Sequence, residues 1–323
     1  MKVLEVSRYK NNFVGNQLPF VTEQGESLRA LGHEVEYFLV RGNYVKAFGA
    51  LKRKIREFQP DIIHAHYGLS AIVAELQNQV PVITTFHNGE THRWWVNLLS
   101  SLFSLRAKYV IYVAEHIHQM VYFKARNYSI IPCGVTLEDC FLMDKAEARK
   151  KLGWDVDKKY IMFGGAFSNT RKNYELLAEA VVRLTNEGVK DIECIEMKGL
   201  SRAECVLRMN ASDVFALPTR NEGSPQALKE AMAVNCPIVA TDVADIKHLL
   251  GDLPGHYILP NKKGTPAFWV GDEHNAGEMA QLLKEALAFK GRTKGRDRIV
   301  ELQLTNKQVA QRIVDIYMSV LNA

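Results

Sequence analysis

The sequence predicts an α/β protein of two domains, each built on a parallel β-sheet with helices on both faces. The first observation is alternation, because short apolar runs typical of buried parallel strands are separated by segments with helical periodicity. The second is length, since 323 residues are long for one domain and comfortable for two. The third is the segment 213–241, whose pattern indicates a strand, a polar loop, a helix and another strand.

The first half of the chain alternates regularly between the two kinds of element. Apolar runs predict strands at 3–6, 35–40, 61–65, 80–84 and 109–113. Helical periodicity predicts helices at 16–31, 44–58, 68–77, 91–105 and 115–122. Ligands of parallel sheets gather at the carboxyl ends of the strands. Gly15 and His87 each follow a predicted strand, so both are candidates for a ligand site at that edge.

The second half continues the same alternation. Strands are predicted at 161–163, 214–217 and 237–240, and a last strand region begins at Trp269. Helices are predicted at 171–186, 201–210, 225–235, 242–250, 273–289 and 306–321. Residues 251–264 have few apolar anchors and are expected to form a loop.

Two carboxylates flank the start of the helix predicted at 225–235. Pro225 suits the first helical position and Ser224 the N-cap, so backbone N–H groups there point toward the preceding loop. Glu222 lies in that loop and Glu230 lies eight residues on, within the helix. Carboxylates can accept paired sugar hydroxyls in charge-assisted bonds. Glutamate is more often a solvated surface residue, but a loop Glu between a buried strand and a Pro-started helix is well placed for a ligand.

Glycines and basic residues follow the strand predicted at 161–163. Gly164 and Gly165 offer permissive backbone, and Arg171 and Lys172 bring positive charge to the start of the next helix. This combination suits a bound diphosphate. Taken alone, the basic pair could equally be solvated loop residues.

The segment E-G-S-P-Q-A-L-K-E-A-M-A followed by P-I-V-A-T resembles the E-x7-E signature of retaining glycosyltransferases of family 4, which have the GT-B fold. The resemblance implies two Rossmann-like domains facing across a cleft, with the C-terminal helix crossing back to the first. Ile131-Pro132-Cys133-Gly134-Val135 resembles the hinge of the family. We therefore expect one domain at 1–136 with the helix 306–323, and a nucleotide-sugar domain at 137–305.

The resemblance also implies roles for individual residues. Glu222 would face the transferred sugar, Glu230 would hold the ribose, and Lys172 would neutralise the leaving diphosphate. Gly15 and His87 would complete the site from the first domain. The remaining donor contacts would come from Gly165, Arg171, Gly223, Ser224, Pro225, Gln226 and Ala227.

Two positions depart from the pattern of the family. Phe167 stands where the family has an arginine, and Arg171 is the candidate to replace it. Val14 precedes Gly15 where the family commonly has paired glycines, which puts the close approach of backbone to ligand there in doubt.

No metal site or cofactor is predicted, and the nucleotide sugar would act as co-substrate. His64 and His66 would share one face of a strand, but no third ligand is evident at a useful spacing. The run D-I-I-H-A-H is moreover common in the resembled family without a metal. Asp155 and Asp157 form a D-x-D, for which a surface turn is the better interpretation. Five cysteines at irregular spacing, with no C-x-x-C, favour reduced thiols and a cytoplasmic chain.

The net charge of +5 is concentrated in residues 1–136, which hold 15 Lys and Arg against 10 Asp and Glu. Much of the surplus lies on the helix predicted at 44–58, at Lys46, Lys52, Arg53, Lys54 and Arg56. A solvated helix face is the simpler interpretation, and peripheral contact with anionic lipid on the inner face of a membrane is the alternative. Trp94 and Trp95 could add an aromatic anchor, although we expect at least one of them in the core.

The function predicted from these observations is transfer of a sugar, with retention, from a nucleotide-diphosphate donor to a glycan or lipid-linked acceptor. Surface polysaccharide or glycoconjugate synthesis is the expected setting, and no nucleic acid is expected as a partner. A non-catalytic nucleotide- or glycan-binding module and a hydrolase of the epimerase kind remain alternatives. An NAD-dependent oxidoreductase is a further alternative, but no G-x-G-x-x-G follows a predicted strand.

Overall fold

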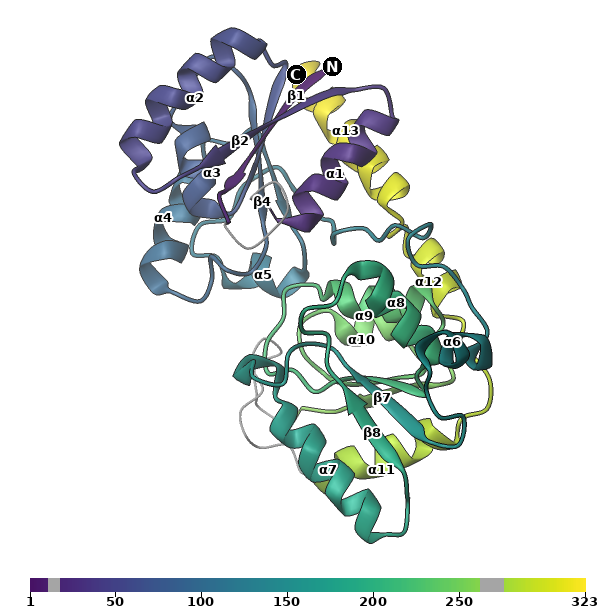
Figure 1. Cartoon of the computed structure of the whole chain (residues 1–323). Coiled ribbons are helices and arrows are strands. Elements are labelled where there is room, and N and C mark those ends of the chain that lie inside the picture. The colour runs from purple at the N-terminus through teal and green to yellow at the C-terminus, as the bar shows by residue number, and fades with distance from the viewer. Residues whose placement is uncertain (11–17, 262–275) are drawn as a thin grey trace. The chain divides into compact units, whose positions relative to one another are not determined.

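The computed structural model describes residues 1–10, 18–261 and 276–323 and divides the chain into two units (Figure 1). The first unit consists of Met1–Gly134 together with Asn306–Ala323, and the second of Val135–Thr305. The chain passes between them after Gly134, two residues before the position that the sequence predicts. Gly15 and Trp269, both named by the sequence analysis, lie outside the described residues.

The first domain is a six-stranded parallel sheet in the order β2-β1-β3-β4-β5-β6. Its strands are β1 Lys2–Arg8, β2 Glu34–Val40, β3 Ile62–His66, β4 Val82–Phe86, β5 Tyr109–Tyr112 and β6 Tyr128–Ile130. Its helices are α1 Pro19–Ala30, α2 Tyr44–Phe58, α3 Gly68–Glu75, α4 Trp94–Ser104, α5 Glu115–Met120 and α13 Asn306–Leu321.

Alternation along β1 and β3 decides which side chains enter the apolar core and which form a polar cluster. Leu4 and Val6 of β1 pack with Ile63 and Ala65 of β3 against α2 and α3. The residues between them point to the opposite face, where α1 and α13 pack on each other. Glu5 and its register partner His64 lie there, so a buried polar cluster forms within the sheet.

The C-terminal helix α13 belongs to the first domain, in keeping with the GT-B fold. Its buried face contains Val309, Ala310, Ile313, Val314, Ile316 and Tyr317. The hydroxyl of Tyr317 lies 2.6 Å from Nδ1 of His64, which ties the end of the chain to β3.

The second domain is a five-stranded parallel sheet in the order β11-β10-β9-β7-β8. Its strands are β7 Lys159–Phe163, β8 Ile192–Ile195, β9 Val214–Leu217, β10 Ile238–Thr241 and β11 His256–Leu259. Its helices are α6 Lys145–Leu152, a 3-10 turn at Thr170–Lys172, α7 Tyr174–Asn186, α8 Arg202–Ala211, α9 Gln226–Ala233, α10 Ile246–Leu250, α11 Ala276–Ala288 and α12 Gly295–Glu301. One face of the sheet is covered by α7 and α11.

Several local expectations were wrong. Residues 251–264 were expected to form a loop, but His256–Leu259 is the edge strand β11. Trp94 and Trp95 were expected to place at least one ring in the core, yet they are 69% and 40% exposed because they begin α4.

In the described part of the chain, no helix combines the length and apolar composition needed to cross a membrane.

Candidate functional site

A cluster of charged side chains lies after two neighbouring strands of the second domain. Lys172 follows β7 and Glu222 follows β9, and these strands pair in parallel, so both residues come from the same edge of the sheet. Gly165 lies beside them, and a Cβ there would come within 2.8 Å of Cγ of Lys172. The glycine therefore leaves the space through which the stem of Lys172 passes.

Glu222 is the centre of this cluster. Its carboxylate accepts from Lys172 Nζ at 2.7 Å and from Thr219 Oγ1 at 3.1 Å, and lies 3.4 Å from Nη1 of Arg171. Burial alone would raise the pKa of Glu222, but the charges of Lys172 and then Arg171 outweigh it and lower the pKa. The side chain stays ionised although the residue is only 6% exposed. It is thus less open to a ligand than a loop position suggests, because two cations already cover it.

The loop between Glu222 and α9 differs from expectation at the cap. Pro225 rather than Ser224 is the N-cap, and it makes no side-chain cap bond. The hydroxyl of Ser224 instead lies 3.3 Å from Nζ of the fully buried Lys229. Burial raises the pKa of Asp245 to about 6, although the nearby charge of Lys229 lowers it. Lys229 therefore contacts the loop through Ser224 and places its charge near Asp245.

The other predicted donor contacts of this domain lie around the same helix start. Gly223, Gln226 and Ala227 are half-buried, with Gln226 and Ala227 in the first turn of α9. Glu230 lies further along α9 and is 6% exposed. Its carboxylate lies 3.1 Å from Nη2 of Arg202, a contact that sequence reasoning missed because Arg202 begins α8.

Phe167 contributes apolar contact where the family has an arginine. Its ring stacks on Tyr174 at 3.8 Å between centroids and lies against the core of the domain. Arg171 donates to the carbonyl of Asn221 at 2.9 Å, beside Glu222. Arg171 and Lys172 thus bring two cations to this edge of the sheet without an arginine at position 167.

His87 of the first domain lies directly after β4, as the sequence predicts. Its backbone N–H donates to the carboxylate of Glu90 at 3.2 Å, and Gly68 donates to the same carboxylate. Burial raises the pKa of Glu90 to about 7, against the lowering effect of these backbone bonds. The ring of His87 lies 4.4 Å from that of Phe20 and 5.0 Å from that of Tyr67. The predicted partner in this region, Gly15, lies outside the described residues.

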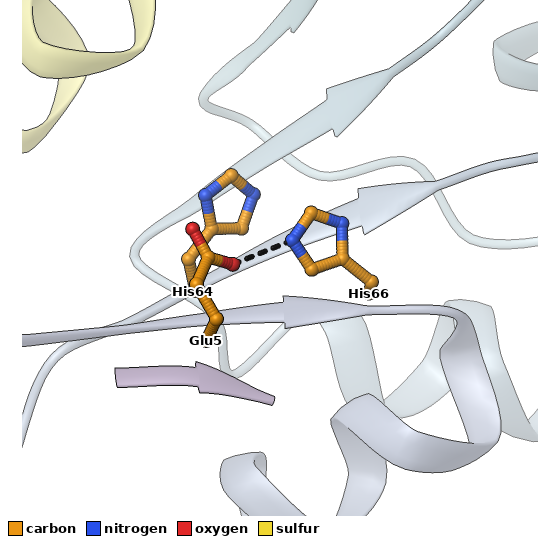
Figure 2. A group of neighbouring side chains, drawn as sticks. All are labelled: Glu5, His64 and His66. Carbon is orange, nitrogen blue, oxygen red and sulfur yellow. Dashed lines mark hydrogen bonds and ion pairs between the residues drawn. The ribbon is translucent and has the colours of Figure 1, made fainter. Parts of the chain in front are cut away.

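Glu5 supplies the third potential metal ligand that the sequence reasoning did not find beside His64 and His66 (Figure 2). The ligand atoms of the three residues lie within 4.8 Å of one another. Sequence spacing could not reveal Glu5, because it comes from the adjacent strand β1. His64 is already hydrogen-bonded at both ring nitrogens, to Tyr317 and to Thr85. A metal would have to displace these bonds.

The basic side chains of α2 lie in the first domain. Lys46, Lys52, Arg53 and Arg56 are exposed, whereas Lys54 forms an ion pair with Glu36 of β2. The exposed charges are therefore four of the five that the sequence analysis named. Tyr44, at the start of the same helix, is also exposed.

Family models match both halves of the chain. Residues 38–139 match the model "Glycosyltransferase Family 4", and residues 158–288 match "Glycosyl transferases group 1". A curated relative, the putative teichuronic acid biosynthesis glycosyltransferase TuaC of Bacillus subtilis (strain 168), is 25% identical over 229 residues. That alignment covers 61% of this chain and 57% of the length of TuaC.

Solved structures share the fold along nearly the whole chain. Sucrose-phosphate synthase from Thermosynechococcus elongatus superposes with a TM-score of 0.77 at 17% identity, covering 99% of each chain. HepE from Anabaena, solved in complex with UDP-glucose, gives a TM-score of 0.72 at 13% identity over 99% of this chain and 100% of its own. At these identities, the likeness establishes the GT-B fold.

Proposed function

We propose that this chain, which belongs to the glycosyltransferases that the family 4 and group 1 models describe, transfers a sugar from a nucleotide-diphosphate donor to a glycan or lipid-linked acceptor. Surface polysaccharide or glycoconjugate synthesis is the proposed setting. The name of the related TuaC, a putative teichuronic acid biosynthesis glycosyltransferase, supports it. The complex of HepE with UDP-glucose supports a nucleotide sugar as donor.

The observation that carries the proposal is the convergence of Lys172 and Arg171 on Glu222 at the carboxyl edge of the second sheet. The two cations would bind the diphosphate and neutralise the charge that grows on it as it leaves. Glu222 would orient the sugar, and Glu230 would hold the ribose while Arg202 supports its carboxylate. His87 of the first domain would contact the sugar once both domains bind the donor.

The reaction would proceed with retention and without a metal. The bond from the anomeric carbon to the diphosphate oxygen breaks, and the acceptor oxygen bonds to the same face of that carbon. The acceptor proton passes to an oxygen of the leaving diphosphate. Lys172 suits the departure of the diphosphate because its ammonium lies 2.7 Å from Glu222 and is already desolvated beside this fixed anion. The cation therefore needs little reorganisation as negative charge develops.

The test is a thermal-shift screen of the full chain against UDP, GDP, ADP, CMP and their sugars, followed by assay of transfer and nucleotide release. Glu222→Gln and Lys172→Met should each lower turnover by about 100-fold or more, in the range for lost electrostatic stabilisation. Lys158→Met is the matched control, since Lys158 forms an exposed ion pair with Glu193. Turnover near that of the wild type in Glu222→Gln would contradict the assignment. Donor binding with neither transfer nor hydrolysis would favour the non-catalytic alternative.

We further propose that the first domain contacts an anionic membrane surface, where a lipid-linked acceptor would reside. The support is the exposed positive charge of Lys52, Arg53 and Arg56 on α2. The exposed rings of Trp94 and Trp95 at the start of α4 would suit a membrane interface. A cytoplasmic location for this chain is part of the same proposal.

A further inference from the structure

A continuous hydrogen-bond chain links Glu5 to His87 through His66. Nε2 of His66 lies 2.6 Å from Oε2 of Glu5, and Nδ1 of His66 lies 3.0 Å from Nε2 of His87. Figure 2 shows the first of these contacts, with Glu5 on β1 and His66 on β3. Glu5 and His66 are both buried, so water does not compete for these groups.

The donor–acceptor direction of these hydrogen bonds follows from the carboxylate of Glu5. An ionised carboxylate only accepts hydrogen bonds, and the other oxygen of Glu5 accepts from the amide of Gln24 at 3.1 Å. When His66 is neutral, its single ring proton is then on Nε2 and its Nδ1 is a lone pair. That lone pair can be satisfied only by a donor, which makes Nε2 of His87 the protonated nitrogen. Neutral His87 is left with a lone pair on Nδ1.

The surroundings favour a neutral imidazole at His64. Burial, followed by the charges that His66 and His87 would carry, holds the pKa of His64 well below its usual value. His64 stacks on His66 at 4.5 Å between ring centroids. On the other side of the chain, Nδ1 of His87 lies 3.8 Å from Sγ of Cys133, a weak hydrogen-bond donor that a stronger one can replace.

We infer that Glu5 and His66 are positioning residues that hold His87 in one tautomer, so that His87 presents Nδ1 as a hydrogen-bond acceptor to a hydroxyl of the bound sugar. This inference rests on the proposed function for the identity of the ligand. The chemistry of the contact is set within the first domain alone. A lone pair at Nδ1 accepts a hydrogen bond from an O–H group, whereas it repels a phosphate oxygen. His87 therefore recognises the sugar rather than the diphosphate.

The experiment is nitrogen-15 NMR of the full chain with labelled histidine, recorded at pH 8, above the ordinary histidine pKa of about 6.5. Long-range proton–nitrogen correlations distinguish the protonated ring nitrogen from the bare one, and the His87→Gln variant assigns the His87 signals by their loss. In the wild type we expect His87 to be protonated on Nε2 and bare on Nδ1. Protonation of His87 on Nδ1 in the wild type would by itself overturn the inference.

Glu5→Gln tests the cause. A glutamine amide can donate to Nε2 of His66, which would reverse the chain, so the proton of His87 should move from Nε2 to Nδ1. Glu75→Gln is the matched control, because Glu75 is another buried carboxylate of this domain and its side chain bonds Thr84 instead. It should leave the His87 pattern unchanged. An unchanged pattern in Glu5→Gln, or the same reversal in Glu75→Gln, would refute a positioning role for Glu5.

A metal titration distinguishes the hydrogen-bonded cluster from a metal site formed by Glu5, His64 and His66. One equivalent of Zn²⁺ should leave the signals of His64 and His66 in place, because their ring nitrogens are already bonded within the protein. Stoichiometric displacement of the His64 and His66 signals would show a metal site and overturn the inferred positioning of His87. The NMR result does not depend on catalysis. A confirmed tautomer without sugar transfer would therefore refute the proposed function alone, and activity with the opposite tautomer would refute only this inference.

Discussion

Glu222 is a single carboxylate on which burial and charge act in opposite directions. Burial raises its pKa, and Lys172, then Arg171, lower it further than burial raises it. A carboxylate with a lowered pKa in the folded state stabilises the fold at neutral pH, and this contribution is lost as the pH falls through the folded pKa. Lys172 should therefore be needed for stability as well as for the proposed chemistry.

We predict that Lys172→Met lowers the free energy of unfolding at pH 7 by about 3 kcal/mol, the cost of leaving a buried charge without its partner. The loss should shrink at pH 4, where Glu222 of the variant is more easily protonated. Urea unfolding at the two pH values measures the difference. The double variant Lys172→Met/Glu222→Gln should regain most of the loss, and Lys158→Met, at an exposed pair, should change little. An equal loss at both pH values would argue against this account.

Glu75 shows the opposite behaviour. Burial raises its pKa to about 7, although the bond from Thr84 and the charge of Arg106 lower it. The folded state then binds more protons than the unfolded state between about pH 4.5 and pH 7, so Glu75 costs stability as the pH rises through that window. We predict that Glu75→Gln gains up to roughly 3 kcal/mol over the wild type between pH 4.5 and pH 8. Thermal unfolding across this range tests it, and a difference independent of pH would contradict it.

Among the helices, α2 is specified at both ends and along both faces. The side chain of Asn43 accepts from the backbone N–H groups of Val45 and Lys46, and Gln59 ends the helix with a φ of 50°. Leu51 and its neighbours at helical spacing are buried, which leaves the basic side chains on the outer face. The charge presented to a surface is therefore fixed by the helix itself.

We predict that Lys52→Glu/Arg53→Glu/Arg56→Glu abolishes sedimentation of the full chain with vesicles containing anionic lipid, since each basic residue near such a surface contributes about 1 kcal/mol. Lys54 is left unchanged because Glu36 already neutralises it. The control reverses three exposed lysines of the second domain, Lys150, Lys151 and Lys158. Equal binding by the α2 variant and the wild type would exclude this helix as the contact.

Elements with a strong periodic face were predictable from sequence, as was the edge strand β2, whereas the edge strands β6, β8 and β11 were not. The bounds of α2 and α13 agree with the predicted 44–58 and 306–321. The edge strands β8 and β11 were missed because most of their residues are only half-buried and show no long apolar run.

The residues discussed at the candidate sites also differ in how far the sequence could predict them. Lys172 and Glu222 were predicted from local motifs, whereas Glu5 contacts His66 across 61 positions of sequence. Only strand order, which periodicity does not encode, brings Glu5 and His66 together.

At the scale of the whole molecule, the second domain is one continuous segment with adjacent ends. Val135 donates to the carbonyl of Leu304 at 2.9 Å and forms a parallel bridge with Thr305. The first domain is instead made of two segments, because α13 returns to it. The second domain therefore has its own core and closed ends, the properties expected of a unit that folds alone.

We predict that the fragment 135–305 unfolds cooperatively and binds the same nucleotide diphosphate as the full chain, because Lys172, Arg171 and Glu222 all belong to it. It should not transfer sugar, since the first domain would supply the proposed sugar contact of His87. Circular dichroism on heating and nucleotide-dependent thermal shift measure the two properties, with Lys172→Met in the fragment as the binding control. A folded fragment that ignores every nucleotide bound by the full chain would show that the donor depends on the first domain for affinity, and the assignment of diphosphate binding to the second domain would then fail.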